Sequence, residues 1–306
     1  MGTASLRLRA NLILLLTAVI WGFAFVAQRS GMEHVGPFTF NAIRFVIGAL
    51  VLVPLMAALD RRRVVAGVPV VGWRNRPLLV GGALAGAVLF AAATLQQMGL
   101  IFTTAGKAGF ITSLYVVLVP LLGLALRQRT TAAVWAGVAL AAAGLYFLTM
   151  EGGFHMAWGD LLVLLGAILW ACHVLLLGRL SPRTDPVKLA FAQFVACAVL
   201  SGGAALLTET TTAVALRAAL VPILYAGFMS VGAGYTLQVI AQGHARPADA
   251  AIILSLEAVF AVFGGWLLLG EQLSSRALFG CALMLAGILV SQLVGRAEEP
   301  VVEVGH

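Results

Sequence analysis

The chain has 306 residues, of which 61% are hydrophobic, with only 19 Lys and Arg and 12 Asp and Glu and a mean hydropathy of +1.03. Soluble domains carry about a quarter charged residues, because a folded surface needs polar cover. The composition therefore excludes a cytosolic enzyme, a secreted disulfide scaffold and a disordered chain. It predicts an all-α integral membrane protein, since Leu, Ala, Val and Gly form long runs without the alternation of barrel strands.

The first apolar segment, residues 11–28, follows Arg7 and Arg9 and has the layout of a signal peptide. We expect it to be retained as a membrane span, because a matching segment occurs later in the chain. Ten such segments are each close to the roughly 20 residues with which a helix crosses a bilayer. The predicted spans are 11–28, 37–59, 78–98, 105–125, 131–149, 158–178, 186–207, 218–238, 248–269 and 275–294.

The Lys and Arg residues are divided unevenly between the two sides of a ten-span chain. Fourteen lie in segments on one side and four on the other, with Arg44 inside a span. Because loops rich in Lys and Arg stay in the cytoplasm, both termini are predicted to be cytoplasmic in a multi-pass protein of a bacterial inner membrane. The topology accounts for the net charge of +7, so no nucleic-acid partner is expected.

The second half of the chain repeats residues of the first half in the same order. The matched pairs, at offsets of 142, 143 or 149 residues, are Trp21 with Trp170, Pro37 with Pro186, Phe45 with Phe194, Leu95–Gln96 with Leu237–Gln238, Ser113–Leu114 with Ser255–Leu256, and Gly137 with Gly280. Each copy covers five spans, and an odd number forces the second copy to enter the membrane from the opposite face. The sequence therefore predicts two inverted five-helix repeats, residues 1–149 and 150–295, followed by a polar tail, 296–306. The alternative is accidental matching between helices rich in Leu and Ala.

Residues of both halves resemble a known family. Residues 18–25 (AVIWGFAF), with Pro37, Asn41 and Arg44 after them, resemble the first repeat of the EamA family in the drug/metabolite transporter superfamily. Residues 254–261 (LSLEAVFA) and 269–273 (LGEQL) are similar to the end of its second repeat. The resemblance covers residues 10–295 and implies ten spans, inverted repeats and transport of small solutes. Within the family, the chain most resembles bacterial amino-acid exporters of the YddG type.

Small residues recur every fourth position in the fifth span, at Ala133, Gly137 and Ala141, and again in the tenth, at Ala282 and Ala286. Such faces allow two helix backbones to approach closely. The family resemblance implies that these two helices pack against each other. We interpret the small residues as packing positions and assign them no part in solute binding.

Two ionisable residues are predicted to lie at membrane depth. Arg44 follows the helix-starting Pro37 by seven residues, which places it roughly 10 Å deep at 1.5 Å per residue. Glu257 lies at a similar depth from the opposite face, and Asn41 shares the helix face of Arg44. Such groups usually face the interior of a bundle. Arg44 and Glu257 are therefore expected to line or close a solute pathway, binding the carboxylate and ammonium ends of a zwitterion; the alternative is a structural ion pair or helix clamp.

Further amphipathic side chains are predicted at mid-helix positions, where aromatic walls and a few hydrogen-bonding groups would suit a small zwitterion. Ordinary packing is the alternative for each, and a buried structural imidazole for the histidine. These candidates are Trp21, Gln96, Tyr115, Trp170, His173, Tyr235 and Gln238.

No cofactor, metal or ATP site is expected. Residues 105–108 (AGKA) superficially resemble a phosphate-binding loop, but Ala108 stands where Ser or Thr is required and Ile101 replaces the first Gly. Acidic residues and histidines lack the spacing of a metal site. Hydrolysis of ATP is therefore not expected to drive this protein.

The sequence as a whole favours a secondary transporter that exports small metabolites, with amino acids as the expected solutes, by alternating access through a cavity between the repeats. Two other classes stay open: a membrane enzyme acting on lipids or isoprenoids, and a passive solute channel. The expected partners are the solute and membrane lipid. The sequence assigns neither the solute, the driving force nor the oligomeric state.

Overall fold

The computed structural model describes residues 3–103, 105–127, 130–149, 157–269 and 274–291, and every element in these ranges is helical. The elements in chain order are α1 (Thr3–Gly31), α2 (Pro37–Val65), α3 (Arg76–Leu100), α4 (Ala105–Ser113), α5 (Tyr115–Ala125), α6 (Ala132–Thr149), α7 (Trp158–Leu180), η1 (Ser181–Arg183), α8 (Pro186–Thr208), α9 (Ala213–Ala218), α10 (Leu220–Leu224), η2 (Tyr225–Tyr235), α11 (Thr236–Gln242), α12 (Pro247–Leu254), α13 (Glu257–Leu269) and α14 (Ser275–Leu289).

Eight helical segments of the described ranges are long and apolar enough to cross a membrane. They are Leu6–Gly31, Pro37–Val65, Arg76–Leu100, Ala105–Ala125, Trp158–Arg183, Pro186–Thr208, Leu220–Gln242 and Pro247–Leu268. The predicted fifth and tenth spans correspond to shorter apolar helices, Ala132–Phe147 and Leu278–Leu289. The all-helical membrane fold is thus confirmed for the part described, whereas ten spans stay a prediction. The predicted tail, 296–306, lies outside the described residues.

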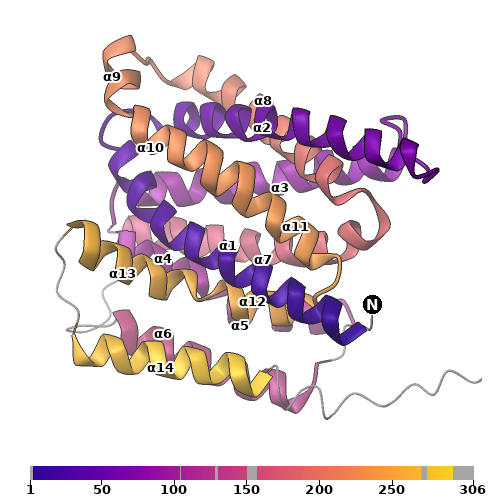
Figure 1. Ribbon diagram of the computed structural model, residues 1–306. Helices are drawn as coiled ribbons and strands as arrows, with labels where there is room; N and C mark the ends of the chain where they lie inside the picture. Colours follow the sequence, from indigo (N-terminus) through magenta and orange to yellow (C-terminus); the bar gives the residue numbers. More distant parts are fainter. Residues whose placement is uncertain (1–2, 104, 128–129, 150–156, 270–273, 292–306) are drawn as a thin grey trace, which may run out of the picture.

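Two helix pairs lie toward opposite sides of the molecule, with most of the other helices stacked between them and α9 beyond the α2/α8 pair (Figure 1). One pair is α2 packed on α8, and the other is α6 packed on α14. The packing of α6 on α14 uses glycines at the contact: a Cβ atom added to Gly137 would lie 2.7 Å from the carbonyl oxygen of Gly287, and one added to Gly287 would lie 2.6 Å from that of Gly137. The prediction is therefore confirmed at Gly137, whereas in α14 the close contact is made by Gly287 and not by the predicted Ala282, which is exposed.

The contacts between helices follow the same pattern in both halves. Each contact occurs again when both helices are replaced by the helices at the matching positions of the other half. Helix α1 packs on η2 and α11, as α7 packs on α3. Helix α2 packs on η2, as α8 packs on α3. Helix α13 packs on α1, as α4 and α5 pack on α7. The central helices of each half are therefore surrounded mainly by helices of the other half.

Two membrane-length segments are interrupted at matching points of the two halves. The segment 105–125 breaks at Leu114, between α4 and α5, and the segment 247–268 breaks at Ser255 and Leu256, between α12 and α13. The backbone tightens locally, since the amide of Leu114 donates to the carbonyl of Ile111 only three residues back. A third segment, 220–242, contains the π-helix η2. Irregular backbone inside membrane-length helices is typical of sites that bind ligands.

The helix ends show how α2 and α8 are held together. Both begin with a proline, Pro37 and Pro186, whose missing amide hydrogen costs nothing at a first helical position. The carboxylate of Glu209, which follows α8, accepts hydrogen bonds from the amides of Phe38 (2.9 Å) and Thr39 (2.8 Å). This contact satisfies two free amides at the start of α2 and fixes the register of the helix pair.

Candidate substrate pocket

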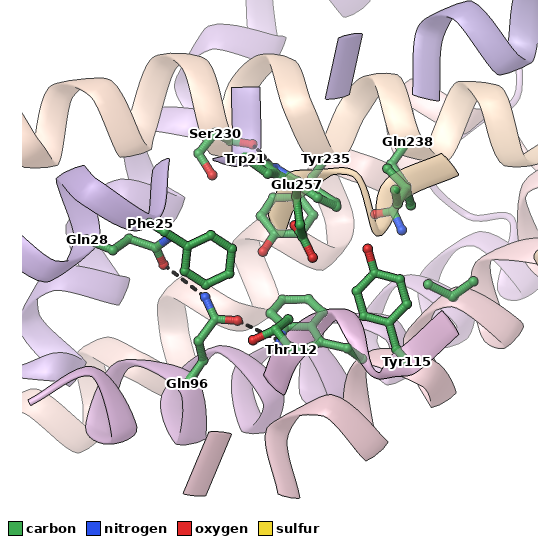
Figure 2. A pocket seen from close by; sticks show the side chains of 13 residues that line it. Trp21, Phe25, Gln28, Gln96, Thr112, Tyr115, Ser230, Tyr235, Gln238 and Glu257 are labelled. Atoms are coloured by element: carbon green, nitrogen blue, oxygen red, sulfur yellow. Dashed lines mark hydrogen bonds between the residues drawn. The ribbon is translucent and has the colours of Figure 1, made fainter. Parts of the chain in front are cut away.

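A pocket lies at the centre of the helix stack, where α1, α3 and α7 meet η2 and the two interrupted segments. About 410 Å³ of space in and at the mouth of this pocket is not filled by atoms, a figure that includes space open to solvent. Figure 2 shows the side chains that point into it, which come from both halves of the chain. The lining residues are Trp21, Phe25, Gln28, Gln96, Thr112, Tyr115, Trp170, Val174, Ser230, Tyr235, Gln238, Leu254 and Glu257.

Three aromatic rings form one wall of the pocket. Tyr235 lies between the two tryptophans: its ring centroid is 4.6 Å from that of Trp21 and 5.8 Å from that of Trp170, on which it is stacked. The indole nitrogen of Trp21 donates to the carbonyl oxygen of Ser230, 3.2 Å away in the π-helix. The wall is therefore apolar on its face and hydrogen-bonded at its edge, as buried tryptophan requires.

A chain of hydrogen bonds runs along another side of the pocket. The indole nitrogen of Trp170 donates to Gln96 Oε1 (2.8 Å), and Gln96 Nε2 donates to Gln28 Oε1 (3.3 Å). The same Gln28 oxygen accepts a hydrogen bond from Arg44 Nη1 (2.7 Å). Gln28 Nε2 donates to the carbonyl of Ala24 (3.2 Å). The amide groups on this side are thus oriented by one another.

Arg44 lies behind Gln28 and does not line the pocket. Its side chain is 1% exposed, and its guanidinium lies 5.0 Å from the ring centre of Phe45. Its Nε and Nη2 atoms make no hydrogen bond, and neither do the side-chain amide atoms of the neighbouring Asn41. Arg44 therefore reaches the pocket only through Gln28.

Glu257 opens the second half of its interrupted segment and points into the pocket (Figure 2). Its side chain is 3% exposed, and no ion pair joins it to Arg44 among the pairs found in the described ranges. The structural ion pair between Arg44 and Glu257, considered from the sequence, is therefore not formed. Tyr115, the residue that matches Glu257 in the first half, opens α5 and also lines the pocket.

Seven of the ten candidate residues predicted from the sequence come together around this pocket, namely Trp21, Gln96, Tyr115, Trp170, Tyr235, Gln238 and Glu257. Asn41, Arg44 and His173 do not line it. His173 is fully buried, with Nε2 2.9 Å from Gln193 Oε1, as expected for a structural imidazole. A role of any of these residues in binding a solute stays a prediction.

Sequence analysis missed several lining residues. Gln28 had a readable signal, because it follows Trp21 by seven residues and so shares its helix face. Val174 likewise follows Trp170 by four residues. The other missed residues, Phe25, Thr112, Ser230 and Leu254, carry no sequence feature that separates them from packing residues. Over the described ranges, no three His, Cys, Asp or Glu side chains are grouped as a metal site requires.

Comparison with known proteins identifies the family. Residues 8–150 and 157–293 match the model of the EamA-like transporter family. The chain belongs to this family. An uncharacterized transporter of Archaeoglobus fulgidus is 33% identical over 94% of this chain and 87% of its own length. A probable amino-acid metabolite efflux pump of Salmonella typhimurium is 26% identical over 90% of this chain and 92% of its own.

The fold also has a counterpart among solved structures. One chain, described only as a crystal structure of a protein, superposes with a TM-score of 0.75 at 22% sequence identity, covering 95% of this chain and 99% of the other. The family match over residues 8–150 and 157–293 confirms the resemblance to EamA proteins predicted from residues 10–295. The family match, the transporter names of the relatives and the apolar helices together indicate a multi-pass membrane transporter of small molecules. Transporters are a class distinct from enzymes.

Proposed function

We propose that this EamA-like protein is a secondary transporter with ten spans in two inverted five-helix halves, both termini in the cytoplasm. It exports amino acids or closely related metabolites across a bacterial inner membrane. The central pocket binds the solute and is open to one side of the membrane at a time. Rocking of the two halves about the pocket closes it to one side of the membrane and opens it to the other.

One observation carries the proposal: residues at matching positions of the two halves line the same pocket. The pairs are Trp21 with Trp170, Gln96 with Gln238, and Tyr115 with Glu257. Packing alone gives no reason for three such pairs to converge. A site shared by two inverted halves is the arrangement from which alternating access follows, because either half can close over it.

Other features support two inverted halves. The matched segments 8–150 and 157–293 divide the chain near its middle. Matching helices of the two halves make matching contacts. The breaks at Leu114 and Leu256 are separated by the repeat offset of 142 residues. The asymmetry of Lys and Arg supports cytoplasmic termini.

The chemistry of the pocket supports an amino-acid-sized solute. Its aromatic wall can cover an apolar side chain, and its amides and carboxyl can bind polar ends. The name of the Salmonella relative, a probable amino-acid metabolite efflux pump, points to the same class of solute.

Transport is tested with the purified protein reconstituted in liposomes. Vesicles loaded with one unlabelled amino acid are diluted into the same labelled amino acid, and the panel covers all twenty. Saturable, transient accumulation of label above equilibrium supports a carrier. Equilibration without such an overshoot indicates a channel, and chemical conversion of the solute without movement indicates an enzyme; either result contradicts the proposal.

A further inference from the structure

The polar groups at one side of the pocket are already paired within the protein. Gln28 Oε1 accepts two hydrogen bonds, Gln96 uses both its oxygen and its nitrogen, and the indole nitrogens of both pocket tryptophans are bound. A solute gains little from groups that are already satisfied, because it must break one hydrogen bond to form another.

Four buried oxygen atoms of the pocket lining have no hydrogen-bond partner of good geometry, although the Tyr115 hydroxyl lies near the Glu257 carboxyl. They are Thr112 Oγ1, Tyr115 Oη, Gln238 Oε1 and Glu257 Oε1. Each side chain is 3% exposed or less. Figure 2 shows the carboxylate of Glu257 between Tyr235 and Tyr115, with the amide of Gln238 on the same side. Buried polar atoms are almost always hydrogen-bonded, so these oxygens need a further partner, which a bound solute or water can supply.

The chemistry of these oxygens specifies the charge of a solute that would bind to them. A carboxylate and an amide oxygen only accept hydrogen bonds, whereas the two hydroxyls can accept or donate. Glu257 has the one carboxyl group among the residues that line the pocket. A buried carboxylate is costly without a counter-charge. The group that fits this side is a cation that donates several hydrogen bonds.

We propose that Glu257, Tyr115 and Gln238 form a subsite for a primary ammonium group, and that this group is the required feature of the solute. A carboxylate on the solute is not required, because Arg44 lies behind Gln28 and is bound to it. This inference rests on the proposed function and specifies which end of the solute is recognised, namely a primary amine, with or without a carboxylate.

The charged and titratable groups around Glu257 agree with a cation subsite. From η2, Tyr235 lines the pocket, and from α5, Tyr115 does. Helix α4, which packs on α13, contributes Thr112 to the pocket, and its one basic residue, Lys107, pairs with Asp160 2.5 Å away. Helix α1 contributes Trp21, Phe25 and Gln28, all uncharged.

Three compounds that share a phenyl ring and differ in their polar ends test the inference: phenylalanine, 2-phenylethylamine and 3-phenylpropionate. Each is titrated into the purified full-length protein in detergent by isothermal calorimetry. Phenylalanine and 2-phenylethylamine are expected to bind, and 3-phenylpropionate about tenfold or more weakly, because a hydrogen bond to a charged group is lost. Binding of 3-phenylpropionate as tight as that of the amine, or of no compound at all, overturns the inference.

Two variants connect binding to the subsite. Glu257→Gln keeps the shape of the side chain and is expected to weaken 2-phenylethylamine about tenfold or more. Tyr115→Phe removes one hydroxyl only and is expected to weaken it about threefold or more, so it provides a second readout should Glu257→Gln fail to fold. Glu33→Gln is the matched control, since Glu33 is exposed and pairs at the surface with Arg29. Equal affinity in wild type, Glu257→Gln and Tyr115→Phe overturns the inference.

A metal cation is the remaining alternative, and it has its own titration. Glu257-dependent binding of sodium chloride in a choline chloride buffer, with no binding of 2-phenylethylamine, would identify the ligand as Na⁺ and overturn the assignment to an ammonium group. Calorimetry involves no transport, so an ammonium subsite can be found in a protein that fails the counterflow test. Conversely, counterflow can succeed in a protein that binds 3-phenylpropionate, which overturns the subsite alone.

Discussion

The hydroxyl of Ser113 donates a hydrogen bond to the backbone carbonyl of Ser255, 3.3 Å away. These serines occupy matching positions of the two halves, and each lies at the break of its interrupted segment. The two breaks therefore touch at the pocket, and the residues after them, Tyr115 and Glu257, open the two half-helices that face it. In the proposed alternating-access cycle, movement of one half against the other would change this contact.

Loss of the Ser113 hydroxyl is expected to affect transport more than stability. Ser113→Ala removes one hydrogen bond, worth about 1 kcal/mol, and leaves the carbonyl of Ser255 without this donor. The melting temperature in detergent should therefore fall only slightly, while counterflow changes in rate at unchanged solute affinity. A large loss of melting temperature with normal counterflow would show that the contact only holds the fold.

Arg44→Ala is expected to reduce both stability and transport. The substitution empties a fully buried volume between Phe40 and Phe45, and large-to-small changes in cores cost about 2–5 kcal/mol. It also removes the donor that holds Gln28, so the pocket loses an oriented amide. Melting temperature and liposome counterflow are measured on the same preparations. Wild-type counterflow in the folded variant would remove Arg44 from any role in transport.

The hydrogen bond between Gln96 and Trp170 can be measured by a double-mutant cycle. Gln96→Leu leaves the buried indole nitrogen without an acceptor, which costs about 1–3 kcal/mol. Trp170→Phe removes that nitrogen, so the double variant should be less destabilised than the sum of the single changes. The expected coupling is about 1 kcal/mol or more, read from denaturation in detergent. Additive effects would contradict the hydrogen bond.

Because α6 and α14 are in close contact at Gly137, replacement of this glycine by alanine is expected to be tolerated less well than the same replacement at Gly203 in α8. A Cβ at position 137 would lie 2.7 Å from a backbone oxygen of the opposite helix, which cannot move aside alone. Gly137→Ala should therefore separate the helices and lower the melting temperature strongly. Gly203→Ala is the control, because nothing lies within 4 Å of its added Cβ; it should be neutral or stabilising by up to about 1 kcal/mol. Equal tolerance at both positions would contradict the packing.

The proposed topology predicts on which side of the membrane two exposed helix ends lie. Val65 ends α2 and Leu207 lies near the end of α8, at 89% and 87% exposure. In a background without Cys172, Cys197 and Cys281, an impermeant maleimide applied to spheroplasts should label Leu207→Cys and not Val65→Cys. Both should be labelled after permeabilisation, which confirms that each cysteine is reactive. Labelling of both in intact spheroplasts would contradict the topology.

Local features of the sequence were enough to predict the class of the protein and the positions of its helices along the chain. Long apolar runs and their prolines predicted the segments that became α2 and α8, and paired residues such as Trp21 and Trp170 showed which positions correspond between the halves. These properties are local or periodic: hydropathy, charge and a first-turn proline act within one helix and its flanking loops. The family followed from the same runs and motifs.

Which side chains contact one another depends on how the helices pack in the tertiary structure. Arg44 and Glu257 have the same signature in the sequence, an ionisable group at mid-depth, yet Glu257 faces the pocket and Arg44 lies behind Gln28. His173 follows Trp170 by three residues but bonds to Gln193 instead. The physical reason is that every face of a membrane helix is apolar on average, so hydropathy does not reveal how the helix is rotated. Rotation is set by packing against neighbouring helices, at contacts such as Gly137 on Gly287, which join residues far apart in the chain.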